Sequence, residues 1–288
     1  MMPINHNSRL FLFGLSFSLS AAFAGGQASP ASSPADLAQR QVTAYLAKLA
    51  DLHCTESVTQ QKLASNGHVE ASERAKYDYL VMINGNGDDF QLNESRIESA
   101  ASRHKQLPML VTNGFSTALL VFHPYYRDGF RFDAGAEEIV DGKPAIPVHF
   151  SHIRGRRTPA ALALRGREYP LELEGTAWID KQSGEVVKMD AGLMNDMSDI
   201  GLRSLSIHVE YKPANLGKGS AGITLPAMAV VDVTTTRQHW RNTHVFDGYK
   251  SFSVEAEQDP NVKIIAGSAN ASSDSTAAVI ATDPKEKP

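Results

Sequence analysis

The sequence predicts a mainly β (α+β) fold, in which one large, curved antiparallel sheet forms an incomplete barrel with two covering helices. Two neighbouring hairpins, over residues 137–150 and 171–191, alternate apolar and polar side chains with a period of two. Short β-prone runs fill most of the remaining chain, and only two segments have helical character, which excludes an alternating βαβ architecture. A sheet of about ten strands curls, so its inner face needs the two apolar helices as a cover.

The turns define the two hairpins. Asp141-Gly142 is a strong signal for a tight primed turn, because Gly accepts the positive φ that such a turn demands. In the second hairpin, Ala177 and Ile179 alternate with Trp178 before the Gly-containing reversal KQSGE, and the alternation then resumes. Two hairpins in succession predict an antiparallel meander.

The first residues have the pattern of a secretory signal peptide. Residues 1–24 carry one charge, at Arg9, then an apolar run and the triplet Ala22-Phe23-Ala24, which predicts cleavage after Ala24. Cleavage removes Arg9 and no acidic residue, so the formal net charge goes from -4 to -5, and a mildly acidic chain is a poor general binder of nucleic acid. No later stretch is long and apolar enough for a transmembrane helix. We therefore expect a periplasmic or secreted protein.

Composition divides the rest of the chain into three parts. Residues 25–35 form a flexible Gly/Ala/Ser/Pro leader, residues 36–257 a single β domain, and residues 258–288 a tail rich in Ala, Ser, Thr, Asp and Lys that is expected to be disordered. All the elements that can build a core therefore lie in the middle part.

The two helices are marked differently. Ser33-Pro34-Ala35-Asp36 supplies a capping hydroxyl, a proline at the first helical position and an acid three residues after the cap. Apolar residues then recur at helical spacing, at Leu37, Val42, Tyr45, Leu46 and Leu49. The second helix is predicted over residues 108–122, from an apolar run that Pro124 ends.

The other β-prone runs complete the predicted sheet. They cover residues 53–62, 75–84, 90–99, 130–134, 204–212, 223–236, 238–246 and 250–257, of which 90–99 is also compatible with a helix. Residues 154–167, between the two hairpins, form a basic insertion with Gly and Pro that is expected on the surface.

One hairpin carries a family resemblance. The run Trp178-Ile179-Asp180, a polar turn with Gly184, and Val186-Val187-Lys188 is similar to a hairpin of the periplasmic lipoprotein carriers, the related sigma-factor regulator sensors and the lipid-binding mycobacterial lipoproteins. As architecture, a secreted chain with an amphipathic helix followed by strands, the resemblance covers roughly residues 36–257 and points to uncharacterised secreted members. The basic insertion and the tail depart from the compact carrier pattern.

The resemblance implies a lipoprotein-carrier-like β domain that binds and does not catalyse. In that family, the concave apolar face of an unclosed barrel receives acyl chains or a partner's apolar segment beneath helical lids. The partner would be a lipid, a lipidated protein or another apolar segment. Peripheral contact with a membrane is a further expectation. No cofactor is implied. Alternation and helical spacing suggest the ligand-binding residues Tyr79, Ile83, Leu119, Phe122, Phe132, Phe150, Trp178 and Tyr211, which on the alternative interpretation are simply packed core.

The basic insertion is a second candidate binding element. Arginine forks match phosphate and carboxylate, so this cluster suits an anionic head group, a glycan or an acidic partner, and the alternative is a solvated loop. Its members are Arg154, Arg156, Arg157, Arg165 and Arg167.

The sequence contains no convincing catalytic or metal-binding set. Ser116, in Gly114-Phe115-Ser116-Thr117-Ala118, lacks the second Gly of a nucleophile elbow, and no oxyanion-hole sequence accompanies it. His149 and His152 are three residues apart on a predicted strand and point to opposite faces, as do His239 and His244, so neither pair chelates a metal locally. Cys54, the only cysteine, is expected to be a buried, unreactive thiol.

Three functional hypotheses follow, and the interior of the sheet separates the first two. A binding protein for lipid or another apolar segment needs a continuous apolar cavity of several hundred Å³, whereas a filled interior favours an envelope interaction or sensor module that uses its outer surface. The third hypothesis, a serine hydrolase, requires a histidine within hydrogen-bond reach of Ser116. Ligand, partner and oligomeric state are left open by the sequence.

Overall fold

The computed structural model describes most of the predicted β domain. The described residues are 33–49, 52–84, 91–98, 110–112, 115, 118–164, 166–214, 216, 222–251 and 277–281. All of them belong to the compact unit that runs from Ser32 to the end of the chain. The predicted signal peptide, most of the leader, Ser116 and Arg165 lie outside them.

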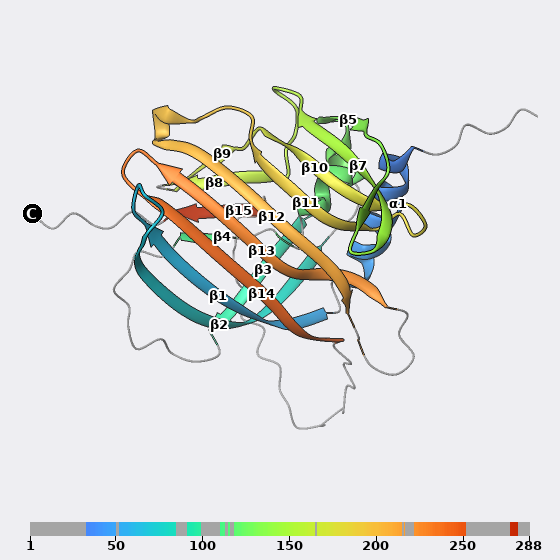
Figure 1. The fold of residues 1–288 in the computed structure, drawn as a ribbon, viewed down its shortest axis with the longest axis horizontal. Coiled ribbons are helices and arrows are strands. Elements are labelled where there is room, and N and C mark those ends of the chain that lie inside the picture. Colours follow the sequence, from blue (N-terminus) through green and yellow to red (C-terminus); the bar gives the residue numbers. More distant parts are fainter. Residues whose placement is uncertain are drawn as a thin grey trace, which may run out of the picture. The chain divides into compact units, whose positions relative to one another are not determined.

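The main sheet has eleven strands, and every pairing within it is antiparallel. Its order, with bounds, is β3 (Gln91–Glu98), β2 (Val69–Asn84), β1 (Leu52–Leu63), β14 (His239–Ser251), β13 (Ile223–Thr235), β12 (Leu202–Ala214), β11 (Val186–Leu193), β10 (Leu173–Asp180), β7 (Lys143–His152) and β5 (Phe130–Ala134), with β6 (Glu138–Val140) also on β7 (Figure 1). The described residues show no pairing between the two end strands, β3 and β5, so the sheet is not closed into a barrel. The predicted fold class is confirmed.

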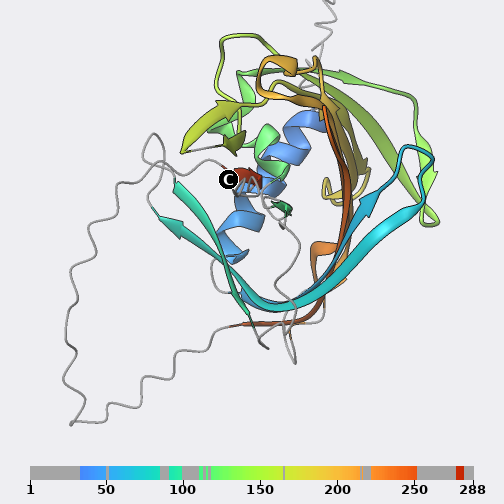
Figure 2. The same cartoon turned by 90° about the vertical axis from the view of Figure 1, so that its left-hand side faces the viewer.

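The sheet curves around the helix α1 (Pro34–Leu49), which lies on its concave side (Figure 2). Alternation of buried and exposed side chains sets the face that each strand presents: Leu52, Cys54 and Val58 of β1 are buried, for example, and Ser57 between them is exposed. The pairing of β1 with β14 joins the two sequence ends of the sheet, with Val58 opposite His244. The first and the last strand of the main sheet therefore lie side by side.

Helix α1 begins as predicted. The Asp36 backbone N–H donates to the Ser33 hydroxyl at 3.2 Å, and the Ser33 N–H donates to the Asp36 carboxylate at 3.2 Å. Each side chain thus accepts a hydrogen bond from the backbone N–H of the other residue. The helix buries one stripe, formed by Ala35, Ala38, Val42, Tyr45, Leu46 and Leu49. This amphipathic element supplies the cover that the concave face needs.

The second helix predicted over residues 108–122 is wrong in its extent. The described part contains the strand β4 (Leu110–Thr112), the 3₁₀ helix η2 (Ala118–Phe122) and the short helix α2 (Pro124–Arg127). Leu119, Leu120, Val121 and Phe122 are all buried, and an apolar run buried on every side carries no period that distinguishes the kinds of structure. Pro124 starts a helix instead of ending one, because proline is well suited to the first helical position.

A second, four-stranded sheet corrects two further expectations. Its order is β4, β15 (Ala277–Ala281), β8 (Ala160–Leu164), β9 (Arg167–Pro170). The insertion 154–167 is thus only partly a surface loop, since Ala161 and Leu162 of β8 are buried. Strand β15 lies within the segment for which the composition predicts disorder, and it pairs parallel to β8 and antiparallel to β4.

The hairpin predictions are confirmed in detail. Asp141 and Gly142 have φ angles of 50° and 78°, as a primed two-residue turn requires, and they join β6 to β7. Residues 91–98 are a strand and not a helix. The two runs 238–246 and 250–257 were expected as separate strands, but residues 239–251 form the single strand β14, in which Gly248 takes a φ of 63°.

Candidate binding site on the concave face

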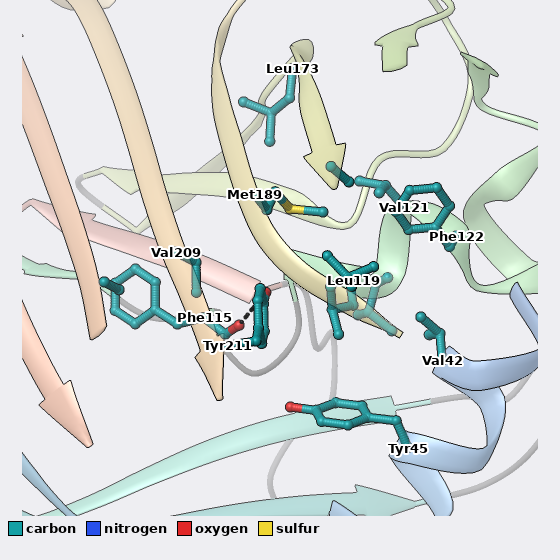
Figure 3. Close-up of a cluster of buried hydrophobic side chains, with 14 of the residues drawn as sticks. Val42, Tyr45, Phe115, Leu119, Val121, Phe122, Leu173, Met189, Val209 and Tyr211 are labelled. Atoms are coloured by element: carbon teal, nitrogen blue, oxygen red, sulfur yellow. Dashed lines mark hydrogen bonds between the residues drawn. The ribbon is translucent and has the colours of Figure 1, made fainter. Parts of the chain in front are cut away.

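The concave face is apolar where α1 and η2 cover it. Val42 of α1 points toward Leu119 of η2, the ring of Tyr45 extends below Leu119 toward Tyr211, and Met189 of the sheet lies above them (Figure 3). All of these side chains belong to one contiguous core that includes α1, η2 and the large sheet. The core is a layer of helix and 3₁₀ turn packed on one face of the sheet.

The described side chains beneath α1 are closely packed, since Val42, Leu119 and Phe122 are at most 4% exposed. A cavity of about 40 Å³ lies along the edge of the helix, lined by the buried Val42 and Tyr45 and also by the exposed Gln41 and Lys48. This volume accommodates a water molecule or two and not an acyl chain. With α1 in its present place, the concave face is a packed core.

Most of the predicted ligand-binding residues gather in this core. Tyr79, Leu119, Phe122, Phe150 and Tyr211 are all buried, between 0% and 4% exposed, and belong to the same contiguous cluster. The hydroxyl of Tyr211 donates to the backbone carbonyl of Phe115 at 3.2 Å. Phe132 is half-buried at the rim, against Phe122. Ile83 lies on β2, and its side chain is outside the described part.

Trp178 does not belong to this set. Its neighbours Ala177 and Ile179 are buried in the core, so alternation directs Trp178 to the outer face of β10. There its indole Nε1 donates to Glu138 at 2.9 Å, and the ammonium of Lys188 lies 4.2 Å from the ring centroid. The prediction that Trp178 shares the ligand-binding face is therefore wrong, because alternation along β10 places Ala177 and Ile179 on that face instead.

The hairpin that carries the family resemblance has a structural role. The Asp180 carboxylate accepts the backbone N–H groups of Gln182 and Ser183, both at 2.8 Å. Burial opposes ionisation, yet these hydrogen bonds dominate and lower the pKa of Asp180. Gly184 has a φ of 75°, and a Cβ there would come within 3.1 Å of Leu37 Cβ on α1. The glycine thus allows both the turn and the close approach of the helix.

A buried ionic cluster occupies the concave face at the β3 end of the sheet. The Arg96 guanidinium donates to both oxygens of Glu56, at 2.5 and 2.9 Å, and lies 5.1 Å from the ring centroid of Tyr79. His244 Nδ1 lies 2.7 Å from Glu56 Oε1, and Glu94 lies 3.6 Å from Arg96. Glu56 is 0% and His244 1% exposed. We did not expect this cluster from the sequence.

The protonation states within the cluster follow from its geometry. Burial raises the pKa of Glu56, but the hydrogen bonds from His244 and Arg96 outweigh it, so the net direction is downward and the group is a carboxylate. Burial lowers the pKa of His244 by more than Glu56 raises it, so the imidazole is neutral. A carboxylate accepts, so Nδ1 carries the proton. One sequence signal was available: Glu56 and Gln60 fall on the inward-facing positions of β1, where apolar residues are expected.

A second feature lies at the rim, where α2 meets β5. An open depression of about 420 Å³ is lined by Arg127, Asp128, Phe130, Phe132 and Arg156. We call it the rim pocket. Arg127, which the sequence analysis did not single out, also pairs with Asp36 in the first turn of α1.

The arginines of the insertion do not act as one cluster. Arg156 lines the rim pocket. Arg157 lies over the ring of Tyr125, with 4.4 Å between its Cζ and the centroid, and Arg154 pairs with Glu172 at 3.4 Å. Arg167 is exposed on β9, and Arg165 lies outside the described part. Of the described arginines of the insertion, Arg156 thus lines the rim pocket and Arg157 contacts α2.

The described residues also decide several chemical questions. His149 is exposed and His152 is buried, so this pair lies on opposite faces, as predicted. His239 shares a face of β14 with the exposed Arg241, two residues on, whereas His244 is buried on the other face. Within the described ranges, no group of three or more His, Cys, Asp or Glu residues is arranged to hold a metal ion. Cys54 is buried, as predicted, and burial raises the pKa of its thiol to about 12, which disfavours the reactive thiolate. Among the described helices, none has the length and apolar character needed to cross a membrane.

The chain matches no protein-family model and no curated protein. Among solved structures it is similar to a LolA superfamily protein of Nitrosomonas europaea, at 11% identity over 75% of this chain and 94% of that chain, with a TM-score of 0.34. It is also similar to a DUF1329 family protein of Desulfovibrio piger, at 13% identity over 76% of this chain and 94% of that chain, with a TM-score of 0.36. An outer membrane lipoprotein-sorting protein domain of Vibrio parahaemolyticus is similar at 12% identity over 79% of this chain and 97% of that chain, with a TM-score of 0.37.

Proposed function

We propose that this chain is a non-enzymatic binding protein of the periplasm or the extracellular space, whose concave face takes an acyl chain or another apolar segment in place of α1. The observation that carries the proposal is the nature of the cover: the amphipathic helix α1, with η2 beside it, lies on the concave apolar face of an open, curved sheet. A helix at the beginning of the domain is an element that can leave while the sheet keeps its hydrogen bonds.

Free energies of burial make this exchange feasible. The large buried side chains of α1 are Val42, Tyr45, Leu46 and Leu49. At roughly 1.5–3 kcal/mol each, they contribute roughly 6–12 kcal/mol to the attachment of the helix. An acyl chain of about 14 methylenes gains roughly 11 kcal/mol from burial on the same surface. The two gross burial terms are thus of similar size, although the helix is part of the chain and a free ligand also loses translational and rotational freedom on binding.

The location rests on residues 1–24, whose pattern is typical of a secretory signal peptide. Lipids, lipidated proteins and apolar segments of partner proteins are all available in the envelope. The absence of cysteine pairs is compatible with this compartment, since the core is large enough to fold without disulfides.

The filled interior favours a second candidate, an interaction or sensor module with a permanently packed core. The cavity of about 40 Å³ is the supporting observation, since a carrier with a preformed site would be hollow. The two candidates differ in one respect: the first requires that α1 leaves the concave face, and the second requires that it stays.

Extraction of the purified protein, followed by mass spectrometry, and uptake of a fluorescent fatty acid test the first candidate. We expect co-purified lipid or saturable uptake. Ile139 and Val245 are 70% and 46% exposed on the outer surface, so the variant Ile139→Ser/Val245→Ser removes apolar surface away from the concave face and serves as control. Uptake that this control leaves unchanged supports the concave site. A protein that is empty and takes up no fatty acid would exclude the first candidate and leave the second.

A further inference from the structure

We propose that the rim pocket holds the phosphate of an anionic amphiphile whose apolar tail enters the concave face. This inference rests on the proposed function and adds the chemical class of the ligand to it. Phosphate requires forked, charged donors at hydrogen-bond distance, and an amphiphile requires an apolar path that leads away from them. The rim pocket offers both.

The donors come from two separate parts of the chain. Arg127 is the last residue of α2, and Arg156 lies in the loop between β7 and β8. The loop is held in place by the Ile153 N–H, which donates to the Gly129 carbonyl at 2.7 Å, and by His152, whose Nε2 donates to the Arg156 carbonyl at 3.1 Å. The two guanidinium groups are thus brought to one depression by fixed backbone.

Arg127 retains donor capacity. One Nη donates to Asp36, and the guanidinium stacks 5.9 Å from the ring centroid of Phe132, which orients it. Its buried Nε has no hydrogen-bond partner within the described residues. A small rotation of the side chain that brings Nε to a phosphate oxygen in the pocket would satisfy this donor, and a buried donor left without a partner is costly.

The charge balance of the pocket favours an anion. Its lining contains two arginines against one acid, Asp128, and the acid Asp36 beside it already accepts from Ser33 and from Arg127. Arg157 adds a further positive charge on the neighbouring Tyr125. The local excess is positive in a chain whose formal net charge is -4, so an anion is attracted to this part of the surface more than elsewhere.

An aromatic path joins the pocket to the concave face. Phe132 of the lining stacks on Phe122 of η2, with 5.2 Å between the ring centroids, and Phe130 lies edge-on to Phe150 at 6.1 Å. Phe122 is fully buried beside α1, in the core described above. A tail attached to a phosphate at Arg127 and Arg156 would therefore continue along Phe132 toward the surface that α1 covers.

The test compares three probes by titration calorimetry at low salt. Decyl phosphate carries both the head and the tail, decyl glucoside carries a neutral head, and inorganic phosphate carries no tail. The variant Arg127→Gln/Arg156→Gln removes both pocket arginines. Arg156→Gln alone keeps the link between Arg127 and α1, in case the double variant folds poorly. Arg154→Gln/Arg203→Gln removes the same charge at exposed positions outside the lining.

We expect decyl phosphate to bind the double variant about tenfold more weakly or worse, since charge-assisted hydrogen bonds are lost. Arg156→Gln should be intermediate, and the control variant should stay within about twofold of wild type, because exposed charges contribute little. Decyl glucoside should bind all variants alike. Equal binding of decyl phosphate to the double and control variants would overturn the head-group site. Inorganic phosphate that binds as tightly as decyl phosphate would also overturn it, in favour of a free-anion site. If neither alkyl probe binds wild type, the proposed function itself fails.

Discussion

The ionic cluster of Glu56, Arg96 and His244 is the most unusual set of single residues in this core. Ion pairs that are taken out of water rarely stabilise a fold more than apolar residues of the same volume, but removal of one partner is costly. Here the carboxylate of Glu56 accepts from both neighbours, and both neighbours are buried. The cluster is therefore a point where a single substitution has a large effect.

We expect Glu56→Gln to lower the free energy of unfolding by about 3 kcal/mol, because it leaves the Arg96 guanidinium buried with a neutral partner. Glu70→Gln is a matched control, since Glu70 also pairs with a cation, Lys62, on the neighbouring strand but is 44% exposed. The control should change stability by less than about 0.5 kcal/mol. Urea unfolding measures both variants. Equal effects would show that the buried pair contributes no more than an exposed one.

The same cluster predicts how stability depends on pH. His244 has a pKa below 6.5 in the folded state because it is buried, so below about pH 6.5 the unfolded chain binds a proton that the folded chain does not, and stability falls with falling pH. Glu56, with its pKa lowered from 4.5, adds a further loss at more acidic pH. In His244→Gln the amide still donates to Glu56 but does not titrate.

The measurement is urea unfolding at several pH values between about 7.5 and 5.5, with the exposed His149→Gln as control. Wild type and His149→Gln should lose stability along the same slope, and His244→Gln should lose less. If the slope of His244→Gln equals that of wild type, the imidazole is not the group that couples folding to pH in this range.

At the scale of elements, close backbone approaches position the loops that surround the candidate sites. At Gly129 a Cβ would lie 2.3 Å from the carbonyl oxygen of Arg157, so the loop that carries Arg156 and Arg157 packs directly on this glycine. A side chain there must push the loop away from α2. That contact holds the loop with Arg156, which lines the rim pocket, against the segment that follows α2.

Gly129→Ala should therefore destabilise the fold by roughly 1–3 kcal/mol, as overpacking typically does, and weaken the binding of decyl phosphate. Gly222→Ala is the control, because a Cβ at Gly222 meets no atom within 4 Å and its φ is not positive. Urea unfolding and calorimetry give the two quantities. A Gly129→Ala protein that binds decyl phosphate as wild type does would show that the position of the loop is not important for the pocket.

Local signals predicted the elements where they were strong. The capping box at Ser33 and Asp36, the Asp141-Gly142 turn and the hairpin of β10 and β11 all correspond to the structure, because each depends on residues close in sequence. The period of two predicted for β11 is not observed, since Val186 and Met189 are its buried residues and a register shift lies opposite its start. The helix predicted over residues 108–122 is wrong in its extent, since the apolar run of η2 is buried on all sides and contains no period. The placement of Trp178 on the concave face is also wrong, because its neighbours Ala177 and Ile179 occupy that face.

At the scale of the whole molecule, the sequence predicted a curved antiparallel sheet with a helical cover but not which strands meet. β1 pairs with β14, and Glu56 and His244 on these strands are 188 residues apart in the sequence. No local pattern in either strand predicts this pairing. The ionic cluster and the rim pocket both depend on such long-range contacts. For that reason the candidate sites became visible only in the structure, although their residues are plain in the sequence.

The central claim concerns α1: it covers an apolar surface that a ligand can occupy instead. A disulfide between the helix and the sheet would prevent the exchange. Leu37 and Gly184 are suited to it, since a Cβ at Gly184 would lie 3.1 Å from Leu37 Cβ, slightly below the usual separation in a disulfide. Cys54 does not interfere, because it is buried and burial raises its pKa to about 12. Gly184→Cys alone controls for the cost of a side chain at positive φ.

The most direct measurement is the uptake of a fluorescent fatty acid by Leu37→Cys/Gly184→Cys in its oxidised and reduced forms. If α1 must leave the concave face, the oxidised protein takes up little or no fatty acid, and reduction restores uptake to the level of the Gly184→Cys control. Equal uptake by the oxidised and reduced forms would contradict the account, because the ligand would then bind somewhere that α1 does not cover.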